Sequence, residues 1–177
     1  MKKSSLKIIF PFFFILILLA QARIATPNGN ELEIAFLRQA YLKSLWKMEC
    51  GKIAVRQTET ADVKHFAQLM TIHYSALCDE LSAHLRKRGI IPPNDFDSTQ
   101  KDTLAYLSRQ RGAGIDREYL SMAGDDLLED LRHYQRGFQQ LKDPDLKILV
   151  EKSLKTIKED SILADRTLRS IPPPVLK

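Results

Sequence analysis

The chain has 177 residues, a length typical of one domain, and 28% of its residues are charged. Its formal net charge is +5, but three of the positive charges are lysines of an N-terminal segment without acids, and subtracting them leaves +2. No basic stretch with interleaved aromatic residues occurs, which argues against a nucleic-acid partner.

Residues 1–22 have the pattern of a secretory signal peptide. Basic residues precede an apolar run from Ile8 to Ala20, and the segment ends in the A-x-A motif Ala20-Gln21-Ala22. A membrane anchor is the alternative, but the run is shorter than the ~20 residues of a spanning helix and contains Pro11. We therefore expect cleavage before Arg23, a periplasmic or secreted protein, and no transmembrane span after cleavage.

The remaining chain has apolar residues at helical spacing and no segment that alternates as a strand does. This pattern predicts an all-α protein with four long helices, over residues 31–57, 61–88, 117–141 and 144–170, and a short helix over residues 98–110. The expected organisation is a signal peptide, an N-terminal extension, a helical bundle and a C-terminal tail, over residues 1–22, 23–30, 31–171 and 172–177.

Several residues have the chemistry of helix N-caps, whose side-chain oxygens accept free backbone N–H groups. Asn30 with Glu33 predicts a capping box at the first helix. Thr60 and Asp116 are the expected caps of the second and third long helices. Asp143, which precedes a proline, is the expected cap of the fourth.

The lengths of the connections predict the topology. Two short turns flank one long connection over residues 89–115, which has room to cross the length of a bundle. This connectivity predicts a ferritin-like four-helix bundle with a long crossover between the second and third long helices, containing the short helix. The second and third long helices would then run parallel.

The two cysteines are Cys50 and Cys78, and export would permit a disulfide. Antiparallel pairing of the first two helices places Cys78 about 13 Å along the helix from the residue that faces Cys50. A disulfide needs Cα atoms within about 7 Å, so we expect two unpaired, buried thiols. A nucleophile pair of Cys50 and His73 is disfavoured because the neighbouring Glu49 would raise the thiol pKa.

Each long helix carries one polar candidate on or beside its apolar face, namely Glu49, His73, Asp126 and Asp160. The expected register brings all four to the middle of the bundle, where bundle metal sites lie. Carboxylate and imidazole ligands suit iron, manganese or zinc. The alternative is that His73 is a hydrogen-bonded structural partner of the buried carboxylates.

Two further acid and histidine pairs have i,i+3 spacing, Asp62 with His65 and Asp130 with His133. A di-iron bundle requires two Glu-x-x-His pairs that project inward. Here His65 points away from the apolar face of its helix. His133 lies beside the apolar face of the third long helix. We therefore interpret both histidines as residues outside any metal site.

Four segments resemble a bacterial family of exported ferritin-like four-helix bundles of unknown function, usually labelled "predicted outer membrane protein". They are Glu49-Cys50-Gly51-Lys52-Ile53-Ala54, the run from Val63 through His73, Ile115-Asp116-Arg117-Glu118-Tyr119-Leu120, and Leu154-Lys155-Thr156-Ile157-Lys158-Glu159. The resemblance spans residues 31–170. The family tends to place a histidine in its second, third and fourth helices. Only His73 matches here, and Leu127 and Asp160 stand at the other two positions.

The reduced set of histidines favours a non-catalytic binding or structural role in the cell envelope, without a cofactor. The expected partner is an unidentified envelope protein or a second copy of the chain. The alternative is a metal-binding protein, an oxidoreductase or a metal store, that holds iron, manganese or zinc with Glu49, His73, Asp126 and Asp160.

Overall fold

A computed structural model describes residues 29–172, and these residues form five α-helices and no strands. The helices are α1 (Gly29–Gln57), α2 (Ala61–Lys87), α3 (Ser98–Arg109), α4 (Ala113–Gln140) and α5 (Pro144–Ser170). The all-helical prediction is therefore confirmed. The expected signal peptide, most of the N-terminal extension and the tail beyond Pro172 lie outside the described residues.

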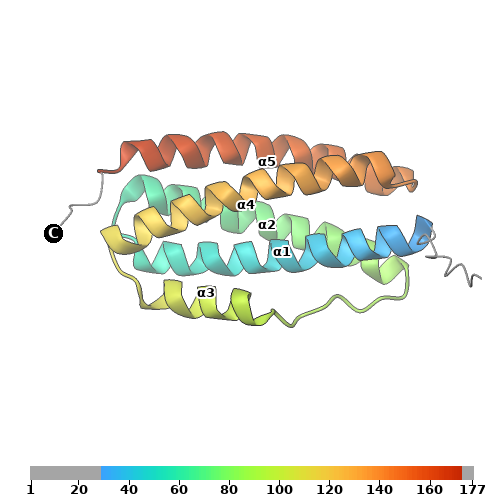
Figure 1. The fold of residues 1–177 in the computed structure, drawn as a ribbon, viewed down its shortest axis with the longest axis horizontal. Coiled ribbons are helices and arrows are strands. Elements are labelled where there is room, and N and C mark those ends of the chain that lie inside the picture. The colour runs from blue at the N-terminus through green and yellow to red at the C-terminus, as the bar shows by residue number, and fades with distance from the viewer. Residues whose placement is uncertain (1–28, 173–177) are drawn as a thin grey trace, which may run out of the picture.

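The four long helices lie side by side (Figure 1). Helix α1 contacts α2 and α4, and α5 contacts the same two helices, so that each long helix has two long neighbours. Figure 1 also shows that the chain between α2 and α4 runs back along the length of the molecule, with α3 beside α1. As a result, α2 and α4 run in the same direction.

The start of α5 forms as expected. The side chain of Asp143 accepts the backbone N–H groups of Asp145 and Leu146, and Pro144 occupies the first turn. Helix α3 has a capping box of Asp97 and Gln100 that was not among the expected caps. Both helix starts depend on hydrogen bonds between residues that are close together in the sequence. Short sequence motifs can therefore predict such starts.

The capping box expected from Asn30 and Glu33 is wrong, because α1 begins before Asn30, at Gly29. The Glu33 carboxylate instead accepts the backbone N–H groups of Lys142 and Asp143 at 3.0 and 2.8 Å. It also accepts a hydrogen bond from the Arg88 guanidinium at 3.2 Å. Burial opposes ionisation of Glu33, but these donors hold its pKa below the usual value.

The expected caps at the opposite end also have a different role. Helix α4 begins at Ala113, so Asp116 lies inside its first turn with 2% exposure. Its carboxylate accepts the hydroxyl groups of Thr58 and Thr60 from the turn between α1 and α2. Thr60 is the N-cap of α2, but its side chain makes no capping bond. Asp116 therefore joins α4 to the first hairpin instead of capping the start of α4.

On α2 the residue expected on or beside the apolar face, His73, lies at the edge of the buried face. Tyr74 is 2% exposed and points into the core, whereas the side chain of His73 is 34% exposed at the flank. On α1 the expected apolar face, with Glu49 among its members, is rotated, because Lys47 and Cys50 are the residues buried there. Helix α1 contacts α2, α3 and α4, so apolar residues occupy several of its sides and do not define one narrow face.

Two glycines of α4 provide a matched test of this packing. An ideal Cβ at Gly137 would lie 2.6 Å from a ring carbon of Phe36, whereas one at Gly124 would have nothing within 4 Å. Gly137→Ala should therefore destabilise the protein by about 1–3 kcal/mol through overpacking. Gly124→Ala should be neutral or stabilise it by up to about 1 kcal/mol through helix propensity. Urea unfolding measures both changes, and equal stability of the two variants would contradict the α1–α4 packing.

Candidate functional site

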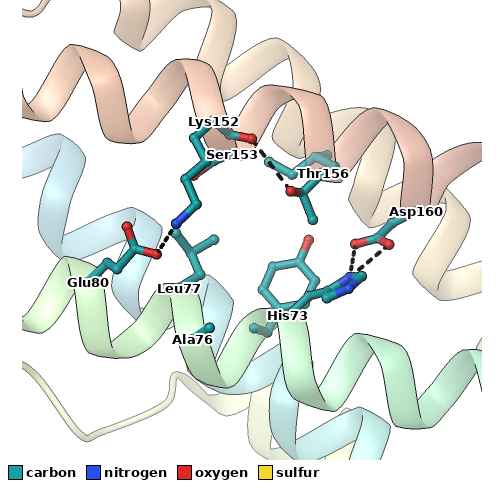
Figure 2. A pocket seen from close by; sticks show the side chains of 10 residues that line it. His73, Ala76, Leu77, Glu80, Lys152, Ser153, Thr156 and Asp160 are labelled. Atoms are coloured by element: carbon teal, nitrogen blue, oxygen red, sulfur yellow. Dashed lines mark hydrogen bonds and ion pairs between the residues drawn. The ribbon is translucent and has the colours of Figure 1, made fainter.

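A cleft of about 170 Å³ lies between α2 and α5, and we call it the α2–α5 cleft (Figure 2). Its walls come from one face of each helix. Helix α2 contributes His73, Tyr74, Ala76, Leu77 and Glu80, and α5 contributes Lys152, Ser153, Thr156, Ile157 and Asp160. The cleft thus has an apolar middle between charged residues.

Two ion pairs cross the cleft from α2 to α5. Nδ1 of His73 lies 3.0 and 3.1 Å from the two carboxylate oxygens of Asp160. Nζ of Lys152 lies 2.7 Å from a carboxylate oxygen of Glu80. Figure 2 shows the two pairs at opposite ends of the cleft, with Leu77 between them. Both pairs therefore connect α2 to α5 across the cleft.

In the His73–Asp160 pair, Asp160 is buried and His73 is partly exposed. The carboxyl group of Asp160 is 4% exposed, and its burial raises the pKa above the usual value although the hydrogen bond to His73 opposes this shift. Nδ1 of His73 faces Asp160, so Nε2 is the ring nitrogen left for another group. This arrangement orients the imidazole and leaves one nitrogen for binding.

A second polar group of residues lies in the core beside this cleft, and we call Lys47, Tyr74 and Asp130 the core polar cluster. Nζ of Lys47 lies 2.8 Å from Oδ2 of Asp130, and the two side chains are 6% and 2% exposed. The Tyr74 hydroxyl donates to the same oxygen at 3.0 Å. Tyr74 also lines the α2–α5 cleft, so it connects the cleft to the core.

The core polar cluster was not predicted from the sequence. A signal for Asp130 existed, because it lies three residues after Leu127 and four before Tyr134, both of which belong to the buried face of α4. The expectation for Asp130 rests instead on its i,i+3 spacing to His133. The structure places His133 against Phe36, with ring centroids 4.9 Å apart, and burial lowers the pKa of this histidine.

Of the four residues expected to converge, the structure brings together His73 and Asp160. Glu49 forms an ion pair with Lys52 on its own helix at 2.8 Å, and the Glu49 side chain is 38% exposed. Asp126 lies beside Lys47 and Cys50 instead. Within residues 29–172 no group of three or more histidine, cysteine, aspartate or glutamate side chains is placed to hold a metal ion. The metal hypothesis therefore depends on His73 and Asp160.

The two thiols are unpaired and buried, as predicted, in α1 and α2. Burial raises the pKa of the Cys50 thiol far above its usual value and that of Cys78 to about 12. A thiolate is the reactive form of cysteine, so neither side chain is prepared to act as a nucleophile near neutral pH.

Breaking the core polar cluster should be costly. Lys47→Met leaves the buried Asp130 carboxylate without its cation, and we expect a loss of about 3–5 kcal/mol. Lys101 is a matched control because it forms an ion pair with Asp95 in which both side chains are exposed. Lys101→Met should change the free energy of unfolding by less than about 1 kcal/mol. Equal losses in urea unfolding would show that the Lys47–Asp130 pair is not buried as described.

Asp126 should make stability depend on pH. Burial raises its pKa to about 6 from an ordinary 3.8, although Lys47 opposes this shift. The folded protein thus binds the Asp126 proton more tightly than the unfolded chain does. The resulting stabilisation is complete below about pH 4 and is lost as the pH rises through 6.

The expected loss is roughly 1–3 kcal/mol, since each pKa unit corresponds to about 1.4 kcal/mol. Asp160, whose pKa is also raised, contributes in the same direction, so the wild type must be compared with Asp126→Asn. Between pH 4 and 7.5 the wild-type free energy of unfolding should fall further than that of the variant. Parallel curves would contradict the burial of this carboxyl group.

Comparisons with known proteins agree with an all-helical fold. No curated protein matches the sequence. Among solved structures, the chain is similar to the "Crystal structure of DUF305 fragment from Deinococcus radiodurans", with a TM-score of 0.72 and 11% identity. That match covers 79% of this chain and 97% of the other, and at this identity it shows the fold alone. Within residues 29–172 no helix has the length and apolar character required to cross a membrane.

A family model described as "Domain of unknown function (DUF4142)" matches residues 19–165, which is more than half of the chain. The chain therefore belongs to the DUF4142 family.

Proposed function

We propose that this chain is an exported protein of the cell envelope with a non-catalytic binding role. Its architecture would be a ferritin-like four-helix bundle with a crossover between α2 and α4 that contains α3. The N-terminal signal pattern supports export. The parallel direction of α2 and α4 supports the crossover.

The α2–α5 cleft is the observation that carries the proposed binding role. Small-molecule sites usually measure about 300–1,000 Å³. This cleft, at about 170 Å³, has room for one or two side chains of a partner protein. Leu77 and Ile157 give it an apolar lining, which fits an apolar side chain from an envelope protein or from a second copy of the chain.

The chemistry of the cleft favours binding over catalysis. The hydroxyl groups of Ser153 and Thr156 donate to backbone carbonyls of their own helix and not to His73. His73 is held by Asp160, and Lys152 by Glu80. A nucleophile is usually activated by a base within hydrogen-bond reach, and these hydroxyl groups do not have that arrangement.

A photo-crosslinking amino acid at position 76 tests the binding role in the native host. Ala76 is exposed at the cleft, and Ala105 is a matched exposed position on α3. We expect a crosslinked species of discrete mass from position 76 and none from position 105. Ala76→Phe, which fills the cleft, should abolish co-purification of the same partner, whereas Ala105→Phe should not. Equal crosslinking from both positions would contradict the proposal.

A metal-binding role is the second candidate, and one geometric observation favours it. A carboxylate on Nδ1 commonly orients a histidine that binds a metal through Nε2. His73 and Asp160 have this arrangement, so iron, manganese or zinc would bind at Nε2 of His73 with further ligands from water or a partner.

Protein purified without a His-tag from its native host distinguishes the two candidates and tests export. On the binding proposal, mass spectrometry should find Arg23 as the first residue, and the metal content should be far below one ion per chain. One iron, manganese or zinc ion per chain that is lost in His73→Ala, but kept in His65→Ala, would establish the metal-binding candidate instead. An intact Met1 form in the inner membrane would contradict export.

A further inference from the structure

A groove of about 420 Å³ lies between α4 and α5 on the outside of the bundle. Leu128 of α4 and Ile162 of α5 line it, and they are 49% and 53% exposed. Gly124 also lines it, and a Cβ added there would have no atom within 4 Å. Helix α3 lies beside α1, on the far side of the molecule from α5, and leaves this groove open (Figure 1). We call this surface the α4–α5 face.

The exposed charges of α5 on this face have an order that is complementary to itself. Asp165 and Arg169 line the groove. Lys155 lies seven residues before Ile162, which is about two helical turns, and Glu151 lies one turn further back, so both share that side of α5. From Glu151 to Arg169 the signs are negative, positive, negative and positive. Reversal of the helix direction therefore sets each charge against its opposite.

We propose that the α4–α5 face binds the same face of a second copy of this chain, in a symmetric dimer. Its twofold axis crosses α5 near the level of residue 160, so that the two α5 helices run antiparallel. In such a dimer each contact of two residues occurs twice. The axis sets Asp165 opposite Lys155 of the second copy, and Arg169 opposite Glu151.

The apolar residues of the face fit the same axis. Because α4 and α5 are antiparallel, the level of residue 160 lies near residue 126 of α4, between Gly124 and Leu128. Leu128 of one copy therefore lies over the groove of the other copy, where Gly124 leaves room. Ile162 lies opposite Lys158, whose apolar stem can cover it while the ammonium group stays in water.

The charges also exclude the other symmetric arrangement. A twofold axis along the helices would place α4 of one copy against α5 of the other at the same level. Asp165 would then lie near Asp125, and Lys155 near Arg132, which are pairs of like charge. Like charges across an interface oppose binding, so the charge pattern selects the antiparallel dimer.

The size of the face suits a stable dimer. Helices α4 and α5 have 28 and 27 residues. Two helices of this length, each about 40 Å long and about 10 Å apart, present roughly 800 Å². A standard interface buries about 800 Å² on each partner. The α2–α5 cleft has other lining residues and stays free, so this inference goes beyond the proposed function and does not depend on it.

Sedimentation equilibrium of the purified protein tests the charge pairs. Asp165→Lys and Lys155→Asp each bring like charges together twice in the dimer, so each should raise the dimer dissociation constant at least about tenfold. The double variant restores opposite charges and should return the constant close to the wild-type value. Asp95→Lys reverses an exposed charge between α2 and α3 and should leave the constant unchanged. A double variant that binds no more tightly than the single variants would overturn the proposal.

Leu128→Asp tests the apolar contact, because it places a charge in the groove of the second copy. The side chain is half exposed, so the variant should keep its helical content, which circular dichroism measures. We expect a monomer at concentrations at which the wild type is a dimer. Ile91→Asp is the control, because Ile91 is 88% exposed between α2 and α3. It should remain a dimer.

Two results of the same experiments would overturn the proposal. The first is a wild type that stays monomeric at every concentration, in which case the groove would belong to residues 173–177 or to another protein. The second is a dimer that Leu128→Asp leaves intact, because the copies would then meet through another face.

Discussion

The buried ion pair between Lys47 and Asp130 connects helices that are far apart in the sequence. Placing an ammonium and a carboxylate in the core costs several kcal/mol of desolvation for each ion, and only close pairing with further hydrogen bonds offsets this cost. Here the pair lies at 2.8 Å, and Tyr74 supplies the added bond. The three residues come from α1, α2 and α4, so this contact requires one relative placement of three helices. The shape of the α2–α5 cleft depends on the same placement, because Tyr74 forms part of the cleft lining.

The two ends of the molecule are held by single buried carboxylates in a similar way. At one end Glu33 accepts backbone N–H groups from the α4–α5 turn and pairs with Arg88 after α2. At the other end Asp116 accepts two threonine hydroxyls from the α1–α2 turn. Each carboxylate joins segments that the chain separates by more than fifty residues. Polar contacts, and not only apolar burial, thus define how the two hairpins meet.

Local patterns were sufficient to predict the helices, the proline-assisted start at Asp143 and the long connection, because caps and turns depend on neighbouring residues. The centre of the bundle was harder to predict. Helical spacing cannot distinguish His73 from Tyr74 as the inward residue when α2 has neighbours on two sides. The burial of Lys47 was not predicted because lysine is usually a surface residue. Its long apolar stem can nevertheless pack in a core when its ammonium group has an ion-pair partner. Glu33 and Asp116 were assigned to caps because their true partners lie far away in sequence.

The connection between α2 and α4 has a consequence for how the chain can be divided. Between Gly89 and Asp97 it contains no helix, and the helices on either side form two hairpins, α1 with α2 and α4 with α5. A break in this segment would separate the two hairpins. One piece would then carry Lys47 and the other Asp130, so each would hold one unpaired member of the buried ion pair. The surfaces of the two pieces would therefore be complementary in charge. A piece that associates with its own copy would bring two like charges together and leave both without a partner. The segment is therefore a natural place to divide the chain into two fragments, because the buried charges on the two pieces are complementary in the native pairing.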